Sequence, residues 1–143
     1  SGFSEISRLC EGIASLRELS NRTLDRLVSY GELISAQLFE INFHSFVSDS
    51  VWADARQLIR TNSRFGNAEV DLLATKKLVA GFRTRHPEAS WVVPGFIAAD
   101  AYGTTTTLGR GGPSRFSNAR LPMLEIPCTT AAVRGGATST SVP

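Results

Sequence analysis

Apolar side chains recur at helical spacing in several stretches of the chain. The first stretch predicts a helix that ends near Leu16, and the next predicts a long helix over residues 20–41 with Ser20 as its N-cap. Asp54 is placed to cap a short helix, and a further amphipathic helix is expected over residues 70–82. Three amphipathic helices and one short helix are therefore predicted.

Short apolar and β-branched segments between these helices predict strands. Residues 43–52 fit one strand or two short ones, and residues 91–98 form an apolar run typical of a strand buried on both faces. A turn at residues 100–103 and a returning strand at residues 104–108 follow. Because helices and strands alternate, we predict an α/β protein with parallel strand pairs, in which residues 91–97 lie at the centre of the sheet.

The composition changes along the chain. Glu125 is the only acidic residue after Asp100, and four of the six prolines lie after Gly112. Such a stretch has little periodic apolar content with which to offset the entropy of ordering it. We therefore expect a regular α/β part over residues 1–112 and an irregular tail over residues 113–143.

Charge and apolar content limit the expected partners. The chain has 15 Lys and Arg against 13 Asp and Glu, a net charge of +2, so nothing indicates a basic surface for nucleic acid. No apolar run approaches the ~20 residues that span a bilayer, and residues 1–5 lack the features of a secretory signal. A cytoplasmic protein without a nucleic-acid or membrane partner is expected.

Cysteine and histidine positions do not predict a metal site. Cys10 and Cys128 lie far apart in the sequence and belong to no paired motif. His44 and His86 are equally solitary. We therefore expect no zinc centre, no disulfide framework and no catalytic histidine.

Residues 104–112 form the most unusual segment of the chain. Consecutive threonines favour extended backbone, and the glycines after them can expose backbone amides to an anion, beside the planar guanidinium of Arg110. A flexible exit from a hairpin is an equally good interpretation. The segment is not a P-loop, because it lacks the Gly-Lys-Ser/Thr ending.

The loop over residues 64–69 is a second candidate. It delivers Glu69 to the start of the helix predicted over residues 70–82, where a negative charge also suits the helix dipole. Glu69 could therefore bind the ammonium group of a ligand or be an ordinary N-terminal residue of that helix. Glu32, on the long helix, is expected to be a solvated charge.

Between about residue 10 and residue 112 the chain resembles aspartate kinase. Six motifs carry the resemblance by their order and gaps: Leu16-Arg17-Glu18-Leu19-Ser20 with Arg22-Thr23-Leu24-Asp25, Ser29-Tyr30-Gly31-Glu32, Asp54-Ala55-Arg56, Phe65-Gly66-Asn67-Ala68-Glu69, Gly95-Phe96-Ile97, and Thr105-Thr106-Thr107-Leu108-Gly109-Arg110-Gly111-Gly112. The resemblance implies the central part of an amino-acid kinase fold, a three-layer α/β/α sandwich around a mainly parallel sheet. It also implies transfer of the γ-phosphoryl group of Mg-ATP to the side-chain carboxylate of L-aspartate, the first step toward lysine, threonine and methionine.

The same resemblance implies roles for five residues. Glu69 would hold the substrate ammonium group, Arg110 would hold a substrate carboxylate, and Phe96 would line the amino-acid pocket. Gly111 and Gly112 would bring backbone amides close to the substrate and the transferring phosphoryl group. The implied partners are L-aspartate and ATP, and no residue is assigned to a metal. Whether the chain forms a homo-oligomer is left open.

Two departures from the family pattern affect the expected activity. The family's opening motif Lys-Phe-Gly-Gly-Thr-Ser, which serves the phosphates, is absent, so we expect the chain to begin inside the kinase domain. After Arg-Gly-Gly the family continues with Ser-Asp, whereas Pro113, Ser114 and Arg115 follow here, and none of them supplies the carboxylate of that catalytic aspartate. We therefore expect a fragment that is inactive alone.

Two alternatives to an inactive fragment follow from the same residues. In one, a partner chain, or another lysine and carboxylate, completes the site. In the other, the chain is a non-catalytic module in which Glu69 and Arg110 still bind an amino acid.

Overall fold

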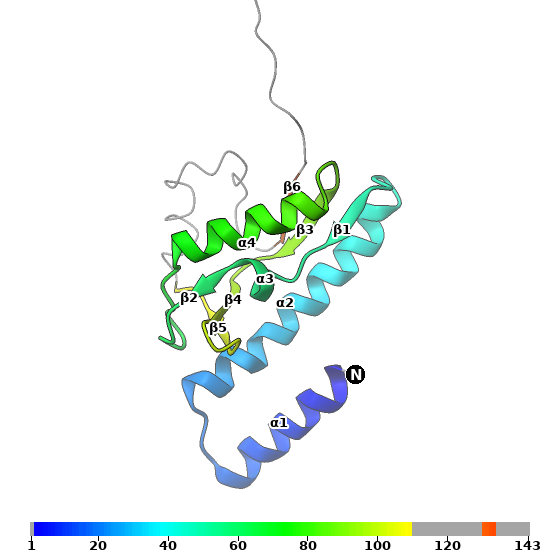
Figure 1. Ribbon diagram of the computed structural model, residues 1–143. Coiled ribbons are helices and arrows are strands. Elements are labelled where there is room, and N and C mark those ends of the chain that lie inside the picture. The colour runs from blue at the N-terminus through cyan, green and yellow to red at the C-terminus, as the bar shows by residue number, and fades with distance from the viewer. Residues whose placement is uncertain (1, 110–129, 134–143) are drawn as a thin grey trace, which may run out of the picture.

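The computed structural model describes residues 2–109 and 130–133, which form the helices and strands of Figure 1. The helices are α1 (Gly2–Leu16), α2 (Asn21–His44), α3 (Ala55–Leu58) and α4 (Leu72–Arg85). The strands are β1 (Ser50–Trp52), β2 (Arg60–Thr61), β3 (Ser90–Pro94), β4 (Ile97–Asp100), β5 (Thr105–Thr107) and β6 (Thr130–Val133). The predicted helices are all present, as is the strand that returns after the turn at residues 100–103.

The N-caps of α2 and α3 are the residues that the sequence predicts. The hydroxyl of Ser20 accepts the backbone N–H of Thr23 at 3.2 Å, and the carboxylate of Asp54 accepts that of Arg56 at 3.0 Å. Each bond satisfies one of the N–H groups that a helix start leaves without a partner. The local sequence therefore determines where both helices begin.

The predicted start of α4 at Val70 is wrong. The helix begins at Leu72, because the carboxylate of Asp71 caps it. Val70 instead lies in extended backbone and forms an antiparallel bridge with Thr61. The competing strand contact thus shifts the helix start by two residues.

The prediction of a strand from residue 43 onward is also wrong in its first part. α2 continues through Phe43 and His44, and strand pairing begins only at Ser50 in β1. The rings of Phe39 and Phe43 lie one helical turn apart and stack with their centroids 5.6 Å from each other. Such a pair of aromatic side chains four residues apart favours helix over strand.

The described strands form two sheets, with the orders β1-β3-β6 and β2-β4-β5. In the first sheet, β3 pairs parallel with β1 and antiparallel with β6. In the second sheet, β4 pairs parallel with β2 and antiparallel with β5. The parallel pairs β1/β3 and β2/β4 both need the crossover through α4 and confirm the predicted α/β character. The antiparallel pair β4/β5 is the hairpin predicted around residues 100–103.

Residues 91–97 form parts of two strands rather than one. β3 ends at Pro94 and β4 begins at Ile97, and between them Phe96 has a φ of 62° in the left-handed region. A proline without an N–H followed by a left-handed residue interrupts an extended run. Both strands are still central in their sheets, as predicted for an apolar segment.

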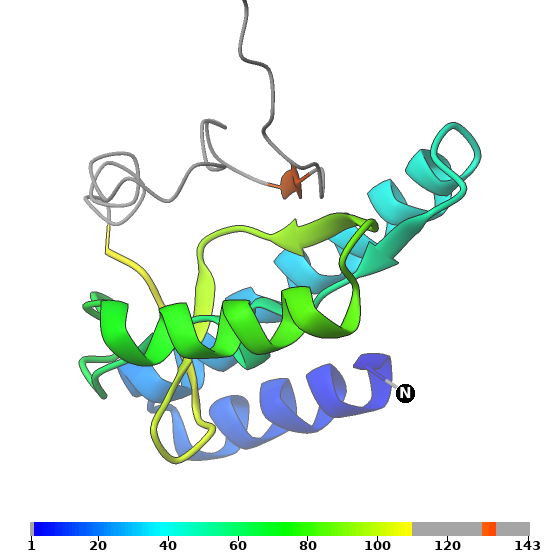
Figure 2. The same cartoon turned by 45° about the horizontal axis from the view of Figure 1, so that its top comes forward.

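Helices cover both faces of β3 and give the expected three layers (Figure 2). On the face covered by α4, Phe82 meets Trp91 edge to face with ring centroids 4.8 Å apart. On the face covered by α2, Val92 is fully buried. Successive residues of a strand point to opposite faces, so Trp91 and Val92 belong to different layers. The apolar core on the α4 side consists of Ala53, Leu58, Phe82 and Trp91.

Most of the predicted tail over residues 113–143 lies outside the described residues. Within it the structure describes Thr130–Val133, the strand β6, which pairs antiparallel with β3 from Trp91↔Val133 to Pro94↔Thr130. The irregular path of the remaining tail stays a prediction.

Glu32 on α2 is half-buried rather than fully solvated as the sequence suggested. Its Oε2 is buried and has no hydrogen-bond partner among the described residues. Burial raises the pKa of the Glu32 carboxyl above its ordinary value of 4.5. Compared with the unfolded chain, the folded state therefore favours the neutral form of this side chain.

We expect Glu32→Gln to stabilise the fold at neutral pH by about 1 kcal/mol, since glutamine removes the cost of a poorly hydrated charge at a partly exposed position. Below the ordinary pKa of 4.5, Glu32 is neutral in both states and the two proteins should be equally stable. As the pH rises through the raised pKa, the wild type alone loses stability. Urea unfolding at about pH 4 and pH 7 measures the effect, and a less stable glutamine variant at pH 7 would contradict it.

Candidate functional site

Four extended segments close into a hydrogen-bonded ring. β2 pairs with β4, and β4 pairs with β5. Leu108, directly after β5, bridges Ala68, and Val70 bridges Thr61 in β2, which completes the ring. The ring therefore fixes the backbone on both sides of Glu69.

Glu69 lies in this ring and not at a helix start. Its backbone N–H donates to the side-chain oxygen of Asn62 at 3.1 Å, and its carbonyl accepts the backbone N–H of Asn62 at 3.0 Å. Asp71, two residues further on, caps α4. The interpretation of Glu69 as an ordinary N-terminal helix residue is therefore wrong.

The carboxylate of Glu69 is accessible to a ligand. The side chain is 57% exposed and accepts from Arg64 Nη1 at 3.4 Å and from Asn62 Nδ2 at 3.3 Å. An exposed ion pair of this kind contributes little net free energy, because water and salt screen it. The ammonium group of a ligand can thus take the place of Arg64 at small cost.

Phe96 reaches the same ring through its backbone. The carbonyl of Phe96 accepts the N–H of Leu108 at 2.9 Å, while Leu108 also bridges Ala68. Phe96 is 41% exposed, whereas Leu108 is buried. Leu108 therefore joins the segments of two predicted site residues, Phe96 and Glu69, and Phe96 is partly accessible.

The predicted site residues Arg110, Gly111 and Gly112 lie outside the described residues. The residue before them, Gly109, is described, and a Cβ added to it would lie 1.5 Å from Asn67 Oδ1 and 2.7 Å from Asn67 Cγ. Gly109 is therefore packed directly against the loop that carries Glu69. Arg110 follows Gly109 in the chain.

Asp25, on α2, connects these segments, and the sequence did not assign it a role. Its carboxylate is 1% exposed and accepts the N–H of Gly66 at 2.9 and 3.0 Å. It also accepts the N–H of Thr107 at 3.0 Å and the Thr107 hydroxyl at 2.6 Å. Asp25 lies with Ser29 and Ala36 on the buried face of α2, whereas the apolar residues Leu24, Val28, Leu38 and Ile41 are partly exposed, so apolar periodicity gives no signal for it.

Asp100 stabilises the turn that leads into β5. Burial alone raises the pKa of the Asp100 carboxyl, but hydrogen bonds outweigh it and hold the pKa below its ordinary value. The donors are the N–H of Thr104 at 2.8 Å, the Ser63 hydroxyl at 2.9 Å and the N–H of Tyr102 at 3.0 Å. At neutral pH the ionised carboxylate therefore holds both the turn and the loop that contains Ser63.

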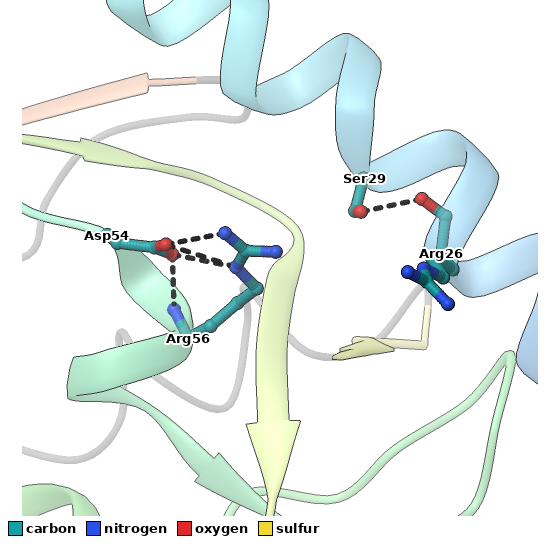
Figure 3. A network of polar contacts seen from close by, with 4 residues as sticks. All are labelled: Arg26, Ser29, Asp54 and Arg56. Atoms are coloured by element: carbon teal, nitrogen blue, oxygen red, sulfur yellow. Dashed lines mark hydrogen bonds and ion pairs between the residues drawn. The ribbon is translucent and has the colours of Figure 1, made fainter. Parts of the chain in front are cut away.

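A separate polar cluster surrounds Arg56 (Figure 3). The Arg56 guanidinium donates to both carboxylate oxygens of Asp54, with the shortest contact at 2.7 Å, and these bonds raise the pKa of Arg56. The pair lines an open hollow of about 420 Å³, to which Arg60 also contributes. Arg60 donates to the carbonyl of Asp100. Both guanidinium groups thus have protein partners, and we assign no ligand to this hollow.

The other candidate groups are structural or isolated. Cys10 is an exposed free thiol, His44 hydrogen-bonds the Ser50 hydroxyl at 2.9 Å, and His86 caps the end of α4. Within residues 2–109 and 130–133, no three His, Cys, Asp or Glu side chains gather as a metal site would need. None of the helices in the same ranges combines the length and apolar character of a membrane span.

Comparison with known proteins finds aspartokinases that are similar to this chain. The chain is 42% identical to lysine-sensitive aspartokinase 3 of Escherichia coli (strain K12) over 114 residues, which cover 76% of this chain and 25% of the relative. It is 35% identical to the chloroplastic aspartokinase 1 of Arabidopsis thaliana over 115 residues, 77% of this chain and 20% of the relative. No family model matches the chain.

Solved structures agree with the sequence comparison. The crystal structure of E. coli aspartokinase III in complex with aspartate and ADP, in its R-state, matches 76% of this chain and 26% of its own length, with a TM-score of 0.61 and 42% identity. The T-state structure with lysine and aspartate matches with a TM-score of 0.58 and 40% identity. The chain thus spans about a quarter of the length of these relatives.

Proposed function

Because a segment covering 76% of this chain belongs to the aspartokinase family, we propose that the chain carries the amino-acid side of an aspartokinase catalytic domain and binds L-aspartate there. In this proposal Glu69 holds the substrate ammonium group and Arg110 holds a substrate carboxylate. Phe96 lines the pocket, and Gly111 supplies a backbone amide to the substrate. The proposal accords with aspartate in both E. coli structures that resemble this chain.

One observation supports the proposal most directly. Leu108 is hydrogen-bonded to Phe96 and bridged to Ala68, and it lies two residues before Arg110. The segments of Phe96 and Glu69, which are far apart in the sequence, are thereby brought to one place, with the Glu69 carboxylate accessible to an ammonium group. In the proposal, Arg110 adds a guanidinium for a carboxylate. An α-amino acid presents both groups, and an Arg fork matches a carboxylate in geometry and charge.

The phosphate side of the reaction has less support. The two lysines of the chain, Lys76 and Lys77, are both exposed on α4. No cluster of metal-ligating side chains occurs in the described ranges. The described residues therefore do not fit a Mg-ATP site, and we assign only Gly111 and Gly112, by resemblance, to a transferring phosphoryl group. We propose that the chain alone binds the amino acid without phosphorylating it.

Calorimetry with L-aspartate tests the proposal. We expect Glu69→Gln to weaken aspartate binding about tenfold or more, since a charge-assisted hydrogen bond to the ammonium group is lost. Glu88→Gln changes the charge equally at an exposed position after α4 and serves as the matched control. Equal affinity of both variants would contradict the role of Glu69, and no heat with the wild type would contradict aspartate binding itself.

A parallel titration with Mg-ATP separates the alternatives. Binding of aspartate without ATP is the result expected here, and it also describes a non-catalytic amino-acid module. Binding of both ligands by the chain would instead favour a site in which another lysine and carboxylate replace those of the family. ATP binding only after a second protein is added would favour completion by a partner chain.

A further inference from the structure

Asp25 is a buried carboxylate held by hydrogen bonds alone within the described ranges. Its partners are two backbone N–H groups and one hydroxyl, and no arginine, lysine or histidine pairs with it there. A carboxylate with acceptor oxygens only fits such a set of donors. Each donor would be left unsatisfied in the interior without it.

The two backbone partners of Asp25 belong to the two segments of the proposed amino-acid site. Gly66 lies three residues before Glu69, and its φ of 83° is a conformation that glycine adopts without strain. Thr107 lies three residues before Arg110. The segments also contact each other directly, because the Thr107 carbonyl accepts the N–H of Ala68 at 2.9 Å.

The hydrogen bonds around Asp25 form a closed triangle, whose corners are the Asp25 carboxylate, the loop that contains Gly66 and Ala68, and Thr107. Two of its sides run from one carboxylate to the two segments, and the third joins the segments through Ala68. Opening the Asp25 corner leaves the parallel bridge between Ala68 and Leu108, which includes the Ala68 N–H to Thr107 carbonyl bond, and the packing of Gly109 on Asn67 to hold the segments in register. The position of Glu69 relative to β5 then becomes less well defined.

We infer that Asp25 is a positioning residue, which holds the loop that carries Glu69 against β5 and thereby favours ligands that carry an ammonium group in addition to carboxylates. This inference rests on the proposed aspartate site. It predicts a change in selectivity and not only in stability. Succinate, which has both carboxylates of aspartate and lacks the ammonium group, does not need the correct spacing to Glu69.

The test compares L-aspartate and succinate by calorimetry on the full chain. Asp25→Asn places an amide N–H against N–H donors, and we expect it to weaken aspartate binding about tenfold while succinate binding changes less than about twofold. Thr107→Val removes only the hydroxyl and should weaken aspartate binding about threefold. Thr107→Ser, which retains the hydroxyl, should restore the wild-type ratio of the two affinities.

Phe82→Leu is the matched control for loss of stability, because Phe82 on α4 is part of the apolar core and contacts Trp91. It should leave the ratio of aspartate to succinate affinity unchanged. If Asp25→Asn or Thr107→Val also leaves this ratio unchanged while the wild type prefers aspartate, the inference is wrong and the proposed function stands. If the wild type binds neither ligand, the proposed function and the selectivity both fail.

Amide hydrogen exchange tests the coupling without any ligand. In Thr107→Val, the amides of Ala68 and Leu108 should both exchange at least about threefold faster, and those of α4 should not change. Acceleration of both amides supports the coupling of the two segments. Acceleration at Leu108 alone would show that the hydrogen bonds of Asp25 do not couple the segments, whatever the binding results.

Discussion

Replacing Trp91 by alanine is expected to lower the free energy of unfolding by about 3–5 kcal/mol. Trp91 is 6% exposed and lies at the centre of the core on the α4 side, in edge-to-face contact with Phe82. Its indole N–H also donates to the carbonyl of His86 at 3.4 Å, which ties β3 to the end of α4. Alanine removes both contacts and leaves a cavity that β3 and α4 cannot both collapse to fill.

Urea unfolding monitored by the fluorescence of the remaining tryptophan, Trp52, measures this loss. Trp91→Phe is the matched control, because it keeps a ring against Phe82 and should cost about 1–2 kcal/mol. Equal stabilities of the alanine and phenylalanine variants would indicate that the edge-to-face contact and most of the burial at Trp91 contribute little. A cost of less than about 1 kcal/mol for alanine would contradict the assignment of this cluster as the core.

The helix starts could be predicted from the sequence because their determinants are local. Ser20 caps α2 through Thr23, and Asp54 caps α3 through Arg56, so each cap and its partner lie within three residues. The start of α4 was misplaced for the opposite reason. Its competitor is the bridge between Val70 and Thr61, which depends on how the chain folds back and not on helix propensity.

The break between β3 and β4 illustrates the same limit. The segment from Trp91 to Ala98 is apolar almost throughout, and apolar content does not distinguish one buried strand from two. What sustains the left-handed Phe96 between them is a long-range bond, from the N–H of Leu108 to its carbonyl. The sequence therefore predicted the burial and central position of these residues, but not their change of sheet.

The candidate site divides in a similar way. Resemblance to a family pointed to Glu69 and Phe96, and the fold brings their segments together at Leu108. Spacing alone left Glu69 ambiguous, since the alternative of a helix start could be rejected only from the ring of extended segments. Asp25 was not predicted as a site residue, because its partner Thr107 is 82 residues away and an acidic residue on a helix is usually solvated.

We expect no L-aspartate-dependent release of ADP from this chain alone. The resemblance to aspartate kinase aligns Ser114 or Arg115 with the family's catalytic aspartate. It aligns neither Lys76 nor Lys77, which lie exposed on α4, with the family's phosphate-binding lysine. Removing one group that stabilises charge in the transition state commonly costs ~10²–10³ in rate, and here two such groups are missing. A coupled assay for ADP, with the full-length E. coli relative as positive control, measures the expected deficit of about 10⁴ or more.

Because the losses of groups that act together are not additive, the size of the deficit is less informative than its dependence on aspartate. Turnover that requires aspartate and disappears in Arg110→Ala would show that other residues of this chain complete the site. Background ATP hydrolysis unaffected by aspartate or by Arg110→Ala would agree with a chain that recognises the amino acid and leaves the phosphoryl transfer to residues it lacks.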